Sequence, residues 1–213
     1  MRLKLVLALS AAITAFAVVA AQAAPVLTIY NNRAAWEAAV AGSFSEEDFT
    51  GFAGTSYQVV PVDVGDFSVS KSGSDFGSEW HNVGPDATGN NVNGSAQINA
   101  ATGEAGGLTL TFDSSIKALG GNFQGISDQR TTSINIGGTI VAIPNLNGGF
   151  WGFTSDTPFT SAFFFLSAGA ADGFGLDNVV YSSAAVPEPA TLSLLGLGLL
   201  GAGARLRRRA TTR

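Results

Sequence analysis

Residues 108–112 read Leu-Thr-Leu-Thr-Phe, and this alternation decides the fold class. A period of two places Leu108, Leu110 and Phe112 on one face of a strand and the two threonines on the other. Similar short segments rich in Phe, Val, Ile and Thr recur between glycine-rich turns, at 26–30, 57–62, 67–70, 118–123, 133–136, 139–143, 150–154, 161–167 and 174–181. This spacing predicts an all-β fold, an antiparallel β-sandwich of jelly-roll type.

Local signals refine that prediction. Gly137-Gly138 lies between two strand patterns and predicts a tight hairpin turn. Residues 163–166, Phe-Phe-Phe-Leu, are apolar on both faces and predict a central strand. Gly120-Gly121 predicts a bulge or a point of close packing.

A short N-terminal helix is the exception to the β pattern. Asn31 or Asn32 is a suitable N-cap, alanines follow, and Gly42 is a stop signal. We expect the helix to end near Val40 and to turn Trp36 and Val40 toward the core.

Residues 71–107 are rich in Gly, Ser, Asn and Ala and predict loops, with short strands near Val92 and at 96–98. This region also contains Trp80 and the single histidine, His81. Sugar binding uses exposed aromatic rings beside polar groups. Trp80 and His81 are therefore the candidate glycan-binding residues, although His81 is equally explained as an exposed loop residue; Trp151 is a second candidate or a core residue.

The N-terminus has the layout of a secretory signal peptide. A basic start precedes an apolar run at 5–20, and Ala21-Gln22-Ala23 fits the small-x-small cleavage rule. We expect residues 1–23 to be removed, with cleavage specified by Ala21 and Ala23; a retained N-terminal anchor is the alternative.

The C-terminal tail, residues 186–213, has three parts. Val186, Pro187, Glu188 and Pro189 form a peptide that prolines keep extended. The uncharged run at 190–204 predicts a transmembrane helix of roughly 22 Å. The arginine cluster that follows predicts a cytoplasmic stop-transfer signal and consists of Arg205, Arg207, Arg208 and Arg209. This orientation leaves residues 24–185 as one domain outside the cytoplasm.

This tail resembles the PEP-CTERM sorting signal of Gram-negative bacteria, here at residues 186–209. The resemblance implies recognition of the Pro-Glu-Pro segment by an exosortase, a membrane-embedded cysteine protease or transpeptidase. It also implies a producer of exopolysaccharide and a precursor held in the inner membrane until cleavage. A plain C-terminal anchor that happens to contain Pro-Glu-Pro is the alternative.

Charge and composition narrow the function classes. Between signal peptide and tail the body has four basic and fifteen acidic residues, a net charge of −11. Nucleic-acid binding needs a basic face, so we expect none. The chain has no cysteine, one histidine and no G-x-S-x-G motif, which argues against thiol, triad and zinc chemistry. A non-enzymatic role is therefore predicted. The alternative is glycoside hydrolysis by a pair of carboxylates, for which five acids are available: Glu46, Glu47, Asp48, Asp75 and Glu79.

No cofactor is predicted, but calcium is a candidate structural ion. Asp172 and Asp177 flank a glycine-rich turn, and calcium prefers carboxylate and carbonyl oxygens. Local hydrogen bonds to the backbone are the favoured explanation of the two aspartates, because the sequence matches no dedicated calcium motif.

Three segments resemble the jelly-roll domains of PEP-CTERM proteins and, more distantly, galactose-binding-like carbohydrate modules: LTLTFDSSIKALGGNF, FWGFTSDTPFTSAFFF and DGFGLDNVVYS. That resemblance implies a calcium ion joining Asp177 to an acid near Glu47 or Asp48. It also implies a surface or extracellular-matrix protein that binds exopolysaccharide. A glycan-processing enzyme and a purely structural surface protein remain the alternatives.

Overall fold

The computed structural model describes residues 24–52, 61–73, 83–85, 94–100, 106–126, 130–146, 148–169 and 172–183. The predicted signal peptide, Trp80, His81 and the whole C-terminal tail lie outside these ranges. Within the part that is described, no helix is long and apolar enough to cross a membrane.

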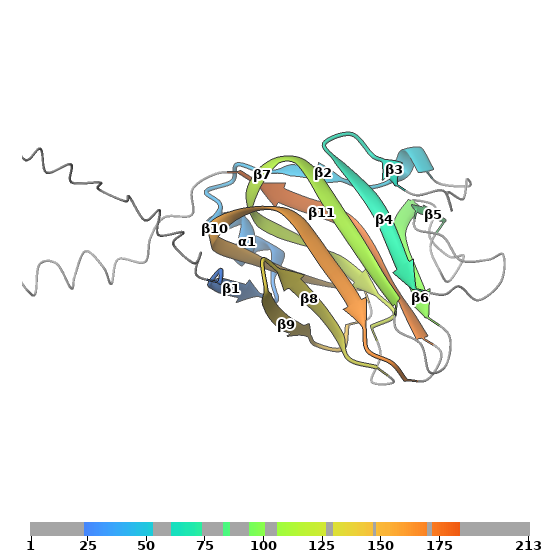
Figure 1. Cartoon of the computed structure of the whole chain (residues 1–213). Helices are drawn as coiled ribbons and strands as arrows, with labels where there is room; N and C mark the ends of the chain where they lie inside the picture. The colour runs from blue at the N-terminus through green and yellow to red at the C-terminus, as the bar shows by residue number, and fades with distance from the viewer. Residues whose placement is uncertain are drawn as a thin grey trace, which may run out of the picture.

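Two long strands organise the molecule: β7 (Gly106–Gln124) and β10 (Gly149–Leu166). They pair with each other antiparallel along most of their length, and the register shifts on both sides of Phe159. Figure 1 shows both strands arching over one end of the sandwich, so that each contributes to both layers. The sequence predicted four separate strands here. This was wrong, because 113–115 and 156–158 form bends within continuous strands.

The other strands extend these two into layers, all by antiparallel pairing. One layer runs from β9 (Thr139–Ile143) through β8 (Thr132–Ile136), the second half of β10 and the first half of β7 to β4 (Phe67–Gly73) and β3 (Val62–Asp63). The other contains β1 (Leu27–Tyr30), the remaining halves of β10 and β7, β11 (Asp172–Ser182), β6 (Gly94–Ala100) and β5 (Val83–Pro85), with β2 (Ser45–Glu47) also beside β11. The predicted antiparallel sandwich is therefore present.

The core is strongly aromatic. Phe123 contacts Trp151, Phe164 and Phe174 with ring centroids 5.7 to 6.2 Å apart, and all four are buried. Trp151 is thus a core residue and not an exposed platform. Burying such rings removes some 150–250 Å² each from water, which makes them the main source of the sandwich's stability.

The close-packing prediction for Gly120-Gly121 is confirmed. A Cβ on Gly121 would lie 2.6 Å from Cδ1 of Leu176, and one on Gly152 would lie 2.9 Å from Cα of Gly120. The strands approach closely here because neither backbone carries a side chain.

The predicted helix is α1 (Arg33–Ala39), with Asn32 as its N-cap. Trp36 and Val40 are fully buried, as expected, in a small cluster with Ala118 and Val180. The Trp36 indole N–H donates to the Phe153 carbonyl at 3.1 Å, which ties the helix to β10.

Two local predictions have different outcomes. Gly137 and Gly138 have φ angles of 54° and 95°, so the hairpin turn between β8 and β9 is confirmed. The region at 71–107 is less loop-like than predicted. It holds the end of β4, β5 and the seven residues of β6, which pairs with both β5 and β11.

Candidate functional site

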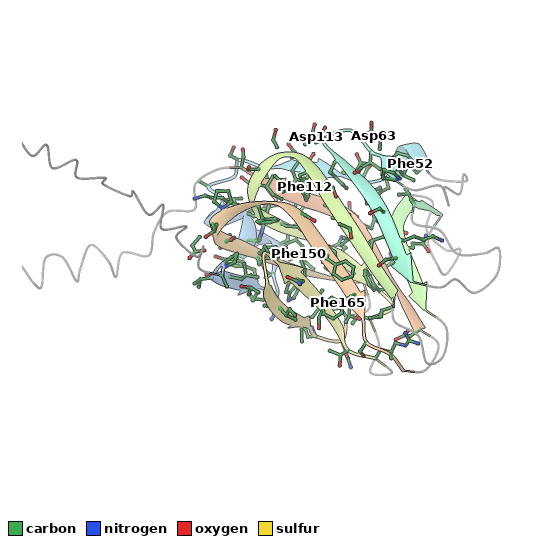
Figure 2. The ribbon with its side chains drawn as sticks, viewed as in Figure 1. Phe52, Asp63, Phe112, Asp113, Phe150 and Phe165 are labelled. Atoms are coloured by element: carbon green, nitrogen blue, oxygen red, sulfur yellow. The ribbon has the colours of Figure 1, made fainter. Side chains whose placement is uncertain are left out.

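A pair of phenylalanine rings lies on the outer face of the β9–β8–β10–β7–β4 layer. Phe164 and Leu166 point into the core and are each 1% exposed, so alternation turns Phe163 and Phe165 outward, where both are partly exposed. Their ring centroids are 5.5 Å apart and their planes differ by 17°. The two rings are therefore stacked, each covering part of one face of the other, and together they form one compact apolar strip on β10. Figure 2 shows Phe165 on this sheet.

Small uncharged polar residues surround this strip. Phe163 is directly opposite Thr109 on β7 and Asn135 on β8, and directly opposed residues share a face. On β4, Ser70 and Ser72 are opposite Thr109 and Gly107. We call this set the phenylalanine face: Phe163, Phe165, Ser70, Ser72, Thr109 and Asn135.

Gly107 makes room for the ring pair. A Cβ at this position would lie 2.2 Å from Cε2 of Phe163 and 2.9 Å from Oγ of Ser72. The Phe163 ring therefore lies across the bare backbone of Gly107. Any side chain there would compete with the ring for the same space.

The sequence prediction missed this face because it treated 163–166 as apolar on both sides and therefore buried on both. The signal was nonetheless present. Alternation along β10 places Phe163 and Phe165 on the face opposite Phe164. On β7, Leu108 and Leu110 face the core, so Gly107 and Thr109 lie on the outer face.

A second site lies at the end of the sandwich where β7 bends. This end pocket has a volume of about 320 Å³, and its walls come from the segment before β2, the start of β4, the bend in β7 and the end of β11. Hydroxyl and carboxylate groups dominate the lining, notably those of Ser43, Ser45, Asp66, Asp113, Tyr181 and Ser183.

Tyr181 is the anchor of the end pocket. Its ring packs against the buried Phe67 and Phe112, with centroids 5.7 and 5.2 Å away. Its hydroxyl donates to Oδ2 of Asp66 at 2.8 Å. Partial burial, followed by the Asp66 carboxylate, raises the pKa of Tyr181 to about 12, so the phenol stays protonated at neutral pH.

The acids considered for calcium fall into two places. Asp172 and Asp177 each accept a hydrogen bond from the next backbone N–H, at 2.8 and 2.6 Å. Five residues of strand span roughly 16 Å, so an ion bound at one aspartate does not reach the other. Among the described residues, no group of three or more potential metal ligands of the His, Cys, Asp or Glu type occurs.

Asp177 does have an acidic neighbour on another strand. β2 pairs with β11 so that Glu47 is opposite Val179, and Asp177 is 4% exposed. Burial raises the pKa of Glu47, with smaller contributions from Asp48 and Asp177, while its hydrogen bond from the Phe49 N–H opposes the rise. Glu47 therefore lies near Asp177, and calcium binding by Asp177 with Glu47 or Asp48 stays a prediction.

Glu46 and Asp48, two other acids considered for a glycan-processing enzyme, have structural partners. Glu46 forms a two-pronged ion pair with Arg33, both N–O distances being 2.7 Å, and Arg33 also bonds Glu37. Asp48 accepts from the Thr50 N–H at 2.9 Å. Asp75 and Glu79 lie outside the described ranges, as do the sorting and stop-transfer residues of the tail.

Comparison with known proteins identifies the tail and finds only weak structural similarity for the body. The PEP-CTERM protein-sorting motif matches residues 185–209. No curated protein matches the chain.

Among solved structures, a mutant of a family 29 carbohydrate-binding module is 13% identical with a TM-score of 0.38, covering 69% of this chain and 96% of that one. The family 11 carbohydrate-binding module of the cellulosomal cellulase Lic26A-Cel5E of Clostridium thermocellum is 9% identical with a TM-score of 0.38, covering 66% and 95%. The enzymatically active domain of tailspike protein 4 of bacteriophage CBA120 is 18% identical with a TM-score of 0.35, covering 56% and 20%.

The β-sandwich is established by the strand pairing of this chain, and its ligand has to be inferred from its own side chains. The chain carries a PEP-CTERM sorting motif at its C-terminal end, which implies export, processing by an exosortase and sorting to the cell surface.

Proposed function

We propose that the protein is a non-enzymatic component of the cell surface or extracellular matrix, cleaved by an exosortase near Pro187-Glu188-Pro189, whose body binds exopolysaccharide through the phenylalanine face. The observation that carries this proposal is the nearly parallel, partly exposed pair of Phe163 and Phe165.

The chemistry of the face suits a neutral sugar chain. The apolar C–H face of a pyranose packs on an aromatic ring, and the sugar hydroxyls need hydrogen-bond partners at its edge. The hydroxyls of Ser70, Ser72 and Thr109 lie beside the rings and both donate and accept. None of the six residues that define the face is charged, so the face itself offers a sugar hydrogen bonds and apolar contact but no ion pair.

Rigidity strengthens the case. The face is built on the central strands of the layer, and β10 pairs with β7 and β8 on either side of the two rings. A binding surface that is already ordered loses little conformational entropy when the ligand arrives. Flexible loop aromatics, by contrast, have to be ordered by the ligand.

The test is a binding titration of the mature protein with exopolysaccharide from its host, comparing wild type, Phe163→Ala, Phe165→Ala and Phe165→Leu. We expect both alanine variants to lose about tenfold or more in affinity, and Phe165→Leu to lose nearly as much because it keeps apolar area but not the flat ring. Val26→Ala is the matched control, since Val26 is 66% exposed and belongs to neither site.

The outcomes separate the candidate functions. Unchanged affinity in Phe163→Ala and Phe165→Ala, with folding intact, would remove the phenylalanine face from the proposal. Depolymerisation of the polysaccharide, abolished by a Glu→Gln change, would favour the glycan-processing alternative. No binding and no turnover would favour a purely structural surface protein.

A further inference from the structure

We propose that the end pocket is a second binding site, selective for a sugar unit that carries a free, protonated amine. It is separate from the phenylalanine face. Figure 2 shows Asp113 where β7 bends at the end of the sandwich, well apart from Phe165 on the sheet. The inference does not depend on the phenylalanine face.

The charge of the pocket selects a cation. Asp66 and Asp113 line it, whereas no Lys or Arg is among its described lining residues. The Asp113 carboxylate is exposed and makes no hydrogen bond or ion pair with any described residue. Two carboxylates without a cationic partner favour a positively charged ligand and disfavour phosphate or uronate groups.

The hydroxyl groups select a ligand with hydroxyls of its own. Ser43, Ser45 and Ser183 add side-chain donors and acceptors around the two carboxylates. The Tyr181 hydroxyl donates a hydrogen bond to Asp66 and also has a side-chain hydrogen bond with Ser45, which leaves one lone pair of its oxygen to accept from a ligand N–H or O–H. An amine flanked by hydroxyls meets both requirements, as in a glucosamine unit.

Size and rigidity fit one or two sugar units. The volume of about 320 Å³ lies at the lower end of the range for small-molecule sites. The walls are fixed: the Tyr181 ring is packed between core aromatics, the Asp113 N–H donates to the Asp66 carbonyl at 3.1 Å, and Ser182 donates to the Ser43 carbonyl. A bare metal ion would leave most of this volume unused.

Ser183, the last described residue of the body, precedes the sorting motif in the sequence. Ser183 lines the end pocket, and three further residues reach Val186, a span of at most about 10 Å of extended chain. A polymer unit held there would be bound near the end of the body that the exosortase processes. The phenylalanine face would bind the same or another chain elsewhere, which raises avidity.

The test is calorimetric titration of the mature protein with glucosamine oligomers, the matched N-acetylglucosamine oligomers and glucose oligomers, at a pH where the amine is protonated. We expect the glucosamine oligomers to bind more tightly than the other two, and to be the only ones that Phe163→Ala still binds; added salt should weaken this binding. Asp113→Asn is expected to lose about tenfold or more in affinity and to stay folded, since the Asp113 carboxylate is exposed and has no partner among the described residues. Asp63→Asn is the control: it removes one exposed acid outside the pocket, and an amide oxygen there still accepts from the Gly65 N–H.

Equal binding of acetylated and free-amine oligomers by Phe163→Ala, or full affinity for glucosamine oligomers in Asp113→Asn, would overturn the proposal. So would a response to calcium alone. Phe163→Ala distinguishes this site from the phenylalanine face, because it should leave glucosamine binding unchanged while neutral polysaccharide binding is lost. Tyr181→Phe should weaken glucosamine binding and keep the ring contacts with Phe67 and Phe112.

Discussion

The most informative perturbation of this protein is Gly107→Ala, which acts on the phenylalanine face without removing either ring. The added Cβ would lie 2.2 and 2.5 Å from Cε2 and Cζ of Phe163, far inside contact distance. These atoms are the far end of a partly exposed ring, so the ring can swing aside. We therefore expect Phe163 to leave the parallel arrangement with Phe165 while the strand stays in place.

The expected magnitudes differ for stability and for binding. Moving an exposed ring off its preferred rotamer costs about 0.5–1.5 kcal/mol, so the melting temperature should fall by only a few degrees. Losing one aligned aromatic contact costs about 0.5–1.5 kcal/mol beyond buried area, or roughly a two- to twelvefold loss of polysaccharide affinity. Gly152→Ala is the contrast. Its Cβ would meet the Gly120 backbone, which cannot move aside as a side chain can, so this substitution should destabilise the core.

A double-mutant cycle with Phe163→Ala makes the test strict. Once the ring is gone, the Cβ of Gly107→Ala meets only the movable Oγ of Ser72, at 2.9 Å, so the two substitutions should be strongly non-additive in both stability and affinity. Thermal unfolding and polysaccharide titration of the four proteins provide the cycle. Additive effects, or a Gly107→Ala protein with wild-type affinity, would refute the placement of the ring over Gly107.

Three further predictions concern the other sites. The pKa of Tyr181 is about 12 in the folded protein against an ordinary value near 10, so the unfolded chain loses this proton at a lower pH. The free energy of unfolding should therefore be unaffected below pH 10 and fall as the pH rises toward 12. Chemical denaturation at several pH values should find a smaller fall in Tyr181→Phe. If Asp177 and Glu47 hold calcium, adding the ion should raise the melting temperature of the wild type and leave Asp177→Asn unchanged; equal responses would exclude this pair. Deleting residues 186–213 should leave unanchored protein in the periplasm, and mass spectrometry of the native mature form should find the arginine cluster removed; an intact C-terminus would contradict processing.

Local patterns were enough for several parts of the fold. The cap at Asn32, the burial of Trp36 and the Gly137-Gly138 turn each depend on neighbours within a few residues. The close approach at Gly120-Gly121 was also predictable, because glycine inside a strand often marks a bulge or a place where another backbone comes near.

The continuity of β7 and β10 was not predictable in this way. Asp113-Ser114-Ser115 and Asp156-Thr157-Pro158 have the composition of turns, so the sequence favours four strands. In the structure each segment bends and continues, because the two long strands pair with each other on both sides of the bend. That choice depends on a partner some forty residues away.

The two candidate sites illustrate the same division. The sequence by itself determined the sorting tail, the strand content, the helix and the acidic body, since these follow from composition and short-range periodicity. Only the tertiary structure decided that Phe163 and Phe165 lie outside the core and that Asp66, Asp113 and Tyr181 meet in one pocket. The physical reason is that a strand's pattern assigns residues to two faces, but pairing between distant strands decides which face is covered and which side chains become neighbours.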